Sequence, residues 1–255
     1  MRRLAAIYLL CSTLMSGAAG AASPDDPLKS ANWEVLKKTY LPGQRIVFDS
    51  HVKVSAPKVA EDSMNVPVGV SVEGLSDVEE VLVLADHNPI VKVLQFYPYA
   101  VKPALSFRFK LQQASPVRAL ARTKDGVWHA GGVWIDAAGG GCTAPSVGRA
   151  GGAWAETLNQ VQSRVWKRED GERLRLRIMH PMDTGLAPGI PAFYIERLSL
   201  SDSSGKELMR MLTFEPVSEN PVLSFDLRAG KRSVGPLMLT GSDNNGNRIQ
   251  AKVLQ

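Results

Sequence analysis

The stretch NVPVGVSVEG, from Asn65 to Gly74, decides the fold class because valine occupies every second position in its central part. Val66, Val68, Val70 and Val72 alternate with small or polar residues. In an extended chain, alternate side chains point to opposite faces, so this pattern buries one face and leaves the other to solvent. The stretch therefore predicts a β-strand with one buried face.

The same period of two recurs in both halves of the chain. In the first half, LSFRFKLQ sets Leu105, Phe107, Phe109 and Leu111 on one face against Ser106, Arg108 and Lys110 on the other. In the second half, ERLRLRIMH alternates aliphatic residues with arginine. Turn dipeptides at Asp125-Gly126, Ser204-Gly205 and Asn245-Gly246 favour hairpins.

Helical signals are few, and the strongest is a short segment, AWAETLNQVQ, over residues 153–162. Strands separated by turns at this spacing predict an all-β protein. We expect two immunoglobulin-like β-sandwich domains, each closing a core between the inner faces of its sheets.

The amino terminus has the features of a secretory signal peptide. Two arginines precede an apolar run from Leu4 to about Met15, and Ala19-Gly20-Ala21 offers a cleavage site, so we expect residues 1–21 to be removed. The apolar run is far shorter than the roughly 20 residues of a transmembrane helix. We therefore expect a periplasmic protein with no membrane span.

A glycine-rich stretch divides the remaining chain into two parts of ordinary domain size. It reads DAAGGGCTAPSVGRAGGA and begins at Asp136. We expect the first sandwich over residues 22–138, an arm over 139–152 and the second sandwich over 153–255. Because glycine lacks a Cβ, Gly139, Gly140 and Gly141 are expected to make the arm flexible and to leave the sulfur of Cys142 exposed.

The chain has two cysteines, and Cys11 lies within the expected leader, so Cys142 has no partner for an internal disulfide. A lone cysteine in an exported protein indicates a reactive thiol or an intermolecular pairing. Only one acidic residue, Asp136, and no histidine lies close to it in sequence, which argues against a catalytic nucleophile. A thiol on a flexible arm instead suits a carrier that holds a substrate covalently for other enzymes, provided that the sulfur is accessible.

An ordinary cysteine has a pKa of about 8.5, so few such thiols are ionised at neutral pH unless a positive group lies nearby. Arg149 is a candidate for that group, although a solvated linker arginine is the simpler interpretation.

Several motifs resemble a known family. The segment MHPMDTG at 179–185, followed by IPAFYIERLSLSDSSGKEL, ENPVLSF and GSDNNGN, resembles the SoxZ family over residues 172–255. The first half resembles SoxY through ADHNPIVKVLQFYP, FRFKLQQASPVRALARTKDGVW and a Gly-Gly-Cys near its end. The whole chain thus resembles the SoxYZ-like fusion carriers associated with quinoprotein dehydrogenases.

The resemblance implies a carrier that is not itself an enzyme. In this family two immunoglobulin-like sandwiches pair, and a cysteine on a glycine-rich arm holds sulfur intermediates while periplasmic enzymes act on them. It implies Cys142 as the attachment residue, Gly139, Gly140 and Gly141 as arm glycines, and no cofactor. The partners implied are periplasmic oxidoreductases, either Sox-type enzymes or a quinoprotein dehydrogenase, and the two domains are expected to pair within one chain.

The arm departs from the family pattern. The family arm is a free carboxyl-terminal tail ending in Gly-Gly-Cys-Gly-Gly, whereas here Thr143, Ala144 and Pro145 follow the cysteine and the chain continues. Such an arm must enter an enzyme doubled over, so we expect its partner to have an open cleft rather than a tunnel. The departure also means that sulfur oxidation of the Sox type does not follow automatically.

A second function class stays open, in which paired sandwiches dock on a periplasmic oxidoreductase as a noncovalent adaptor and the cysteine is incidental.

A copper site could be suggested by Met179, His180 and Met182, but core packing and a strand-ending turn explain these residues better, and we expect no metal. Trp128 and Trp134 are expected in the core or between the domains. Although the formal net charge is +5, no basic stripe with interleaved aromatics is present, which argues against nucleic-acid binding.

Overall fold

The computed structural model describes residues 25–148, 154–231 and 234–254. The expected signal peptide and its Cys11 lie outside these residues, as do Arg149 and the end of the arm. Among the residues described, none of the helices is long and apolar enough to cross a bilayer.

The first domain consists of one helix and nine strands. The helix α1 spans Trp33–Tyr40, and the strands are β1 (Ile46–Phe48), β2 (Val52–Ser55), β3 (Val59–Ala60), β4 (Val66–Val72), β5 (Val78–Ala85), β6 (Lys92–Tyr97), β7 (Val101–Phe109), β8 (Ser115–Thr123) and β9 (Trp128–Ala137).

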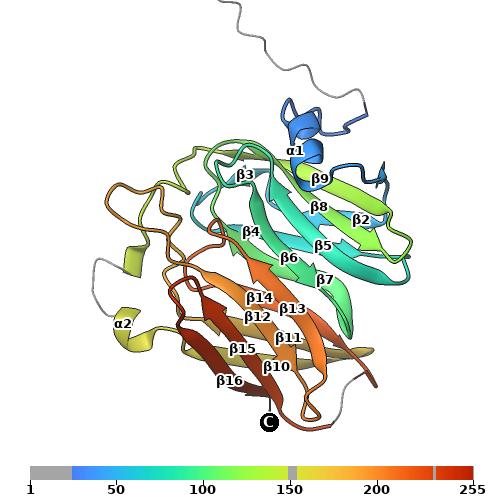
Figure 1. Ribbon diagram of the computed structural model, residues 1–255, viewed down its shortest axis with the longest axis vertical. Coiled ribbons are helices and arrows are strands. Elements are labelled where there is room, and N and C mark those ends of the chain that lie inside the picture. Colours follow the sequence, from blue (N-terminus) through green and yellow to red (C-terminus); the bar gives the residue numbers. More distant parts are fainter. Residues whose placement is uncertain (1–24, 149–153, 232–233, 255) are drawn as a thin grey trace, which may run out of the picture.

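The second domain begins with a single helical turn and continues as seven strands. They are α2 (Trp154–Thr157), β10 (Val161–Arg168), β11 (Gly171–Ile178), β12 (Ile195–Ser201), β13 (Glu207–Thr213), β14 (Val222–Arg228), β15 (Leu237–Asp243) and β16 (Arg248–Leu254). In Figure 1 the blue-to-green first domain stands above the orange-to-red second domain.

Two sheets run through both domains without a break. The larger has the order β1-β9-β8-β5-β6-β13-β12-β15-β16, with β3 pairing to β9, and the smaller has the order β10-β11-β14-β7-β4-β2. The domains meet where β6 pairs antiparallel with β13 and where β7 pairs antiparallel with β14. The predicted all-β class with two sandwich domains is confirmed, and the sandwiches are joined edge to edge through shared sheets.

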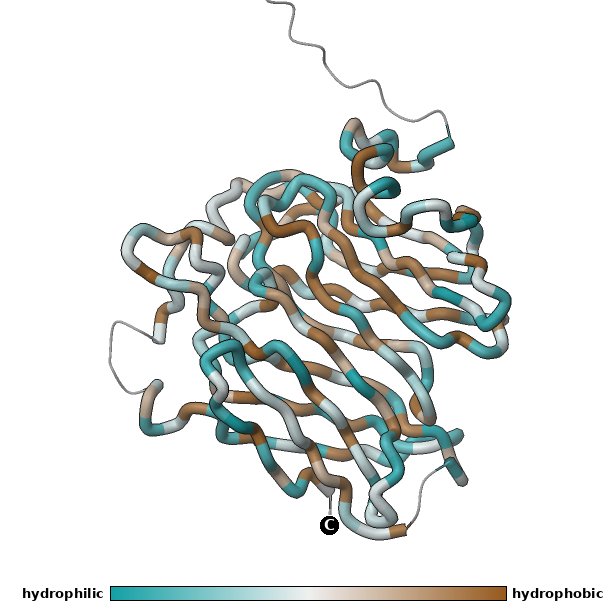
Figure 2. Tube along the Cα trace, in the orientation of Figure 1, coloured by the Kyte–Doolittle hydropathy of each residue, from teal (hydrophilic) through white to brown (hydrophobic). Residues whose placement is uncertain are grey.

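The core follows the alternation read from the sequence. All four valines of β4 are buried, as are Leu174, Leu176 and Ile178 of β11. Figure 2 shows the corresponding change between hydrophobic and hydrophilic positions along the strands. One continuous hydrophobic cluster contains residues from both domains, so the junction belongs to the core.

A buried ion-pair cluster fixes the segment before α1 to the first sheet. Arg118 of β8 is fully buried and donates hydrogen bonds to the carboxylates of Asp26 and Asp86. Its guanidinium lies 4.3 Å from the ring centroid of Trp33 in α1. This buried charge is tolerated because the guanidinium is hydrogen-bonded to two carboxylates and lies against an aromatic ring.

Local predictions failed at three places. The helix expected over residues 153–162 has only the four residues of α2, because Val161 and Gln162 already pair with β11 at the start of β10. The helix α1 carried too weak a signal to be predicted. Trp128 is buried, as expected, but Trp134 is 43% exposed and donates its indole N–H to the Leu28 carbonyl.

The shared core predicts that the two domains unfold together. Phe225 of β14 is buried and pairs with Leu105 of the first domain on one side and Leu174 of the second on the other. Phe225→Ala should lower the free energy of unfolding by about 3–5 kcal/mol, because it leaves a cavity at the junction.

In urea, circular dichroism and tryptophan fluorescence should report one common transition for the wild type and for Phe225→Ala. Val35→Ala, at a 63% exposed position, is the control and should change stability by less than about 0.5 kcal/mol. Two separate transitions in the wild-type protein would contradict a common core.

Candidate functional site

The arm glycines lie against the first domain. The backbone N–H of Gly139 donates to Ser63 Oγ (3.3 Å), that of Gly140 to the Gln112 carbonyl (3.0 Å), and that of Gly141 to the Leu111 carbonyl (3.2 Å). Gly141 is buried, Gly139 is half-buried and Gly140 is exposed, so these contacts correct the expectation that the three glycines form a free arm.

Glycine is needed here for close approach of two backbones. A Cβ on Gly141 would lie 2.1 Å from the carbonyl oxygen of Ser63 and 2.8 Å from that of Leu111. A Cβ on Gly139 would lie 2.6 Å from the Gln112 carbonyl oxygen, and the φ of Gly139 is +99°. No side chain fits these contacts, so the glycines allow the arm to pack tightly rather than to swing.

The thiol of Cys142 is buried, with 0% of the residue exposed. Its Sγ lies 3.5 Å from the Lys110 carbonyl oxygen, to which it donates a hydrogen bond. Its backbone N–H donates to Gln112 Oε1 (3.2 Å). The expectation of an exposed sulfur is wrong for this conformation, because the second domain covers the end of the first domain at which Cys142 lies.

Three side chains of the second domain bond to the backbone of Cys142 and of the arm residues that follow it, and we call them the latch: Asp183, Thr184 and Glu219. Thr184 Oγ1 donates to the Cys142 carbonyl (2.5 Å), and Asp183 Oδ1 accepts the N–H of Ser146 (3.0 Å). The Glu219 carboxylate accepts the N–H groups of Val147 (2.7 Å) and Gly148 (2.9 Å). Hydrogen bonds to an ionised carboxylate are stronger than those between neutral groups.

A buried lysine lies beside the thiol. Lys110 follows the last residue of β7, is 0% exposed, and donates from Nζ to the carbonyl of Met182. Burial lowers the pKa of Lys110, while the negative charges of Asp183 and Glu219 oppose that shift. The sequence pattern placed Lys110 on the solvent face, but the strand alternation ends at Phe109 and the next side chain enters the junction.

Burial raises the pKa of Cys142 to about 11, and the nearby Lys110 opposes the shift without cancelling it. The thiol is therefore protonated at neutral pH. Because the thiolate is the nucleophilic form, the sulfur has low reactivity in the closed arrangement.

The second-domain loop that covers the sulfur is held by His180 and Met182, two residues of the types that bind copper. His180 Nδ1 accepts the N–H of Met182 (3.1 Å), and the sulfur of Met182 accepts the N–H of Ile195 (3.3 Å). Burial lowers the pKa of His180 to about 4, against the opposing effect of Asp243, whose Oδ2 lies 3.5 Å from Nε2. These contacts are structural, and the described part of the chain brings no three His, Cys, Asp or Glu residues together as a metal cluster.

The sequence pointed to Cys142 but not to the groups around it. Asp183 and Thr184 belong to the MHPMDTG motif and Glu219 to ENPVLSF, both quoted only for their family resemblance. Their pairing with an arm 37 to 72 residues away in sequence depends on the domain junction.

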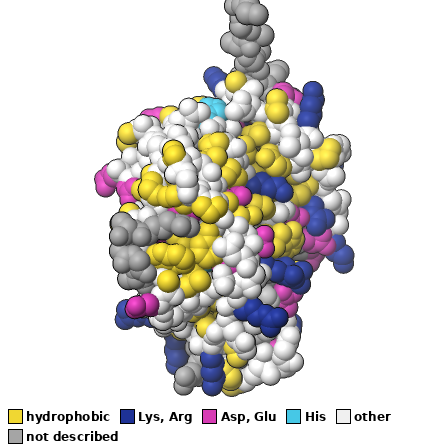
Figure 3. Space-filling view, turned by 60° about the vertical axis from the view of Figure 1, so that its left-hand side comes forward, with side chains coloured by type: hydrophobic (Ala, Val, Ile, Leu, Met, Phe, Trp, Pro, Cys, Tyr) yellow, Lys and Arg dark blue, Asp and Glu magenta, His cyan; other side chains and the backbone are white. Residues whose placement is uncertain are grey.

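Figure 3 shows the side of the molecule on which the arm lies, where hydrophobic side chains gather at the surface. Val147 of the arm is 74% exposed, and Leu186, two residues after Thr184, is 39% exposed.

Two family models match the chain. Residues 37–142 match the model described as sulfur oxidation protein SoxY, and residues 163–253 match the model described as sulphur oxidation protein SoxZ. The two matches together cover more than half of the chain, and the first ends on Cys142.

Among solved structures, the chain is similar to one titled "Structure of the sulfur carrier protein SoxY from Chlorobium limicola f thiosulfatophilum", with 16% identity and a TM-score of 0.38. That match covers 42% of this chain and 91% of the other. No curated protein matches the chain.

The latch should control access to the sulfur. Thr184→Val and Glu219→Ala each remove hydrogen bonds that hold the arm, so each should speed the reaction of Cys142 with 5,5′-dithiobis(2-nitrobenzoic acid) by about tenfold or more. Thr143→Val is the matched control, because the Thr143 hydroxyl is exposed and bonds only to Gln112 and Gly140. Equal rates in all four proteins would show that the latch does not limit access.

The raised pKa of Cys142 predicts a pH dependence. The folded protein binds the thiol proton more tightly than the unfolded chain, whose cysteine pKa is about 8.5. The stabilising contribution of the protonated thiol is thus complete below that value and falls as pH rises toward about 11. Wild type should therefore lose stability relative to Cys142→Ser over this alkaline range, as measured by urea denaturation at a series of pH values. A constant difference between the two proteins up to pH 11 would contradict the assignment.

Proposed function

Since the chain belongs to the SoxYZ family of sulfur-oxidation carrier proteins, with a SoxY domain at residues 37–142 and a SoxZ domain at residues 163–253, we propose that it carries a sulfur-containing intermediate covalently on Cys142. The observation that supports this most directly is the latch. The second domain bonds to the backbone of Cys142 itself and to arm residues that follow it. These contacts hold the segment that carries the sulfur against the second domain, which supports a closed state of a carrier arm.

In this proposal the described conformation is the closed state of a carrier. The arm is held by a limited set of hydrogen bonds rather than by a covalent link, and Cys142 is a free cysteine. When the arm leaves the junction, the sulfur regains contact with water and its pKa returns toward the ordinary value of about 8.5. Closing then protects the thiol, or its adduct, from unwanted reactions between visits to enzymes.

The chemistry of attachment sets the class of partner. Joining the thiol to a sulfur oxyanion forms an S–S bond, releases the thiol proton and removes two electrons. The carrier supplies only the nucleophilic sulfur, so the electron acceptor has to be a partner oxidoreductase. We propose that this partner is periplasmic, either a Sox-type enzyme or a quinoprotein dehydrogenase, and that the carrier itself is not catalytic.

The exposed apolar residues near the arm support contact with such a partner. Val147 and Leu186 flank the segments that cover Cys142 and remain accessible in the closed state. Since the arm is internal to the chain, it reaches an enzyme as a loop, and we propose that the partner offers an open cleft.

A specific observation also favours the second candidate, a noncovalent adaptor. Cys142 is fully buried and its pKa is raised to about 11, as expected of a cysteine that only packs. In that case the paired domains would bind a periplasmic oxidoreductase and the sulfur would never leave the junction.

Whole-protein mass spectrometry separates the two functions. After periplasmic expression and purification without reductant, a carrier should show added mass in steps of sulfur atoms or sulfur oxyanions, which reductant removes. Cys142→Ser should lack this mass while keeping the fold, because serine replaces only the sulfur atom. The Thr184→Val protein should load more fully than the wild type. An unmodified thiol in every preparation, with a Cys142→Ser strain that oxidises sulfur compounds normally, would support the adaptor instead.

A further inference from the structure

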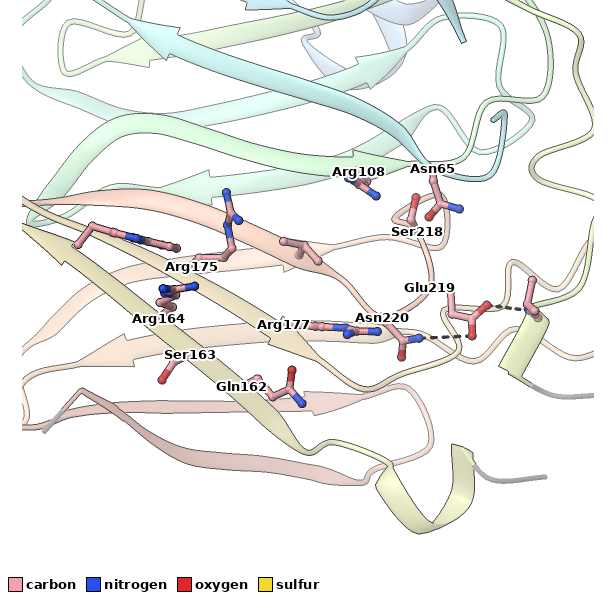
Figure 4. A pocket seen from close by; sticks show the side chains of 13 residues that line it. Asn65, Arg108, Gln162, Ser163, Arg164, Arg175, Arg177, Ser218, Glu219 and Asn220 are labelled. Atoms are coloured by element: carbon pink, nitrogen blue, oxygen red, sulfur yellow. Dashed lines mark hydrogen bonds between the residues drawn. The ribbon is translucent and has the colours of Figure 1, made fainter. Parts of the chain in front are cut away.

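The outer face of the smaller sheet carries a groove with arginines on both sides. It has a volume of about 870 Å³, and Arg164 of β10, Arg175 and Arg177 of β11, and Arg108 of β7 line it. Figure 4 shows that Arg108 comes from the first domain and faces the other three across the groove. The site is therefore complete only when the two domains are joined.

The floor between these arginines is small and uncharged. β14 runs between β11 and β7, and its residue Val222, which pairs in register with Arg177, lines the groove. The next outward residue, Ser224, lies beyond the groove lining and pairs with Arg175. Ser224 also pairs with Ser106 of β7, two residues before Arg108. The arrangement leaves a hollow with positive charge on its two long sides.

In the described part of the chain, neighbouring carboxylates offset only a small part of this positive charge. Among the residues described, these four arginines form no ion pair within 4 Å, whereas Arg173 on the same strand is paired with Asp226. Of the described residues that line the groove, Glu219 alone carries a carboxylate, so the four arginines outnumber the negative charge there, and Glu219 also accepts the N–H groups of Val147 and Gly148.

Repulsion between neighbouring guanidinium groups in the groove would be reduced by a bound anion. Arg164 and Arg175 lie directly opposite each other on paired strands, and like charges in that position destabilise a sheet. Both guanidinium groups lie against Trp166, at 5.3 Å and 5.2 Å from its ring centroid. The ring orients the two groups and offsets part of their repulsion by cation–π attraction. Arg175 also donates its Nε–H to Ser224 Oγ (3.2 Å), which leaves its terminal nitrogens for a ligand.

We propose that this groove binds a sulfur oxyanion, either free in solution or attached to Cys142 after the arm opens. Planar guanidinium groups bind oxyanions through paired hydrogen bonds, and four of them at one open site suit a small anion of two charges. The choice of a sulfur oxyanion rests on the proposed carrier function.

The arm places Cys142 within reach of this site. Val147 lines the groove, and Cys142 lies five residues earlier in the chain. An extended segment of that length spans roughly 17 Å, so an adduct on Cys142 could reach the arginines while Val147 keeps its place. The groove would then hold the negative end of the cargo beside the opened arm.

Titration of the Cys142→Ser protein with sodium thiosulfate and sodium sulfate, at constant ionic strength in sodium chloride, tests the free anion. Saturable shifts of arginine Nε–H resonances in ¹H–¹⁵N spectra are expected. Arg164→Gln/Arg177→Gln should weaken binding by about tenfold or more. The charge-matched control is Arg45→Gln/Arg248→Gln, which changes two exposed arginines outside the groove and should bind as well as its parent.

The attached anion is tested in a Thr184→Val background, where the arm is expected to open. Reaction with sodium (2-sulfonatoethyl) methanethiosulfonate forms a disulfide between Cys142 and the sulfonatoethyl thiol and releases methanesulfinate. Weaker binding of added sulfate after labelling identifies the arm as a source of the anion, and unchanged binding assigns the groove to free anions.

The proposal is overturned if neither salt gives a saturable shift beyond sodium chloride, or if the groove and control variants bind alike. Because the first titration uses protein without a thiol, its result does not depend on whether Cys142 carries sulfur. The two experiments are independent: mass spectrometry can refute the carrier while the groove binds the anion, or support the carrier while the groove does not.

Discussion

Strand pairing across the domain junction is the constraint on which the rest of the structure depends. The backbones of β6 and β13 join one sheet, and those of β7 and β14 join the other. These pairings fix the register of the second domain against the first. They therefore place the loop that contains Met182, Asp183 and Thr184 over the end of β7, where Lys110 enters the junction and Cys142 lies. A looser contact between two separate sandwiches would leave that end open to solvent.

The glycine content of the arm does not by itself decide whether the arm is flexible or packed. Glycine is common both in flexible linkers and where two backbones approach closely, and the two uses look alike in a sequence. Here Gly139 and Gly141 pack against carbonyl groups of the first domain, and the latch residues bond to the arm from the other side. The same glycines that allow this packing would also leave the arm free to move once the latch bonds break.

The free-energy cost of a positive charge differs between the buried junction and the exposed groove. Lys110 is desolvated, so its charge is costly and depends on the carboxylates of Asp183 and Glu219 nearby. The arginines of the groove stay in contact with water, which makes their repulsion tolerable, and a guanidinium remains charged in either setting. Glu219 connects the two regions, since it lines the groove and also holds the arm. Binding at the groove and release of the arm thus share one side chain.

The sequence by itself determined most of the strands and the all-β class, because alternation and turn dipeptides are local signals that need no tertiary contact. Val66 to Val72 and Leu174 to Ile178 were assigned correctly for that reason. The strand β10 was missed because its pairing with β11 decides it, and the helix α1 because its packing on the first sheet decides it.

Only the tertiary structure decided that Cys142 is buried, that Lys110 turns inward, and that four arginines from both domains share a groove. Each of these features depends on distances between segments that are far apart in the chain. The register of the junction strands sets those distances, and no local sequence pattern contains them.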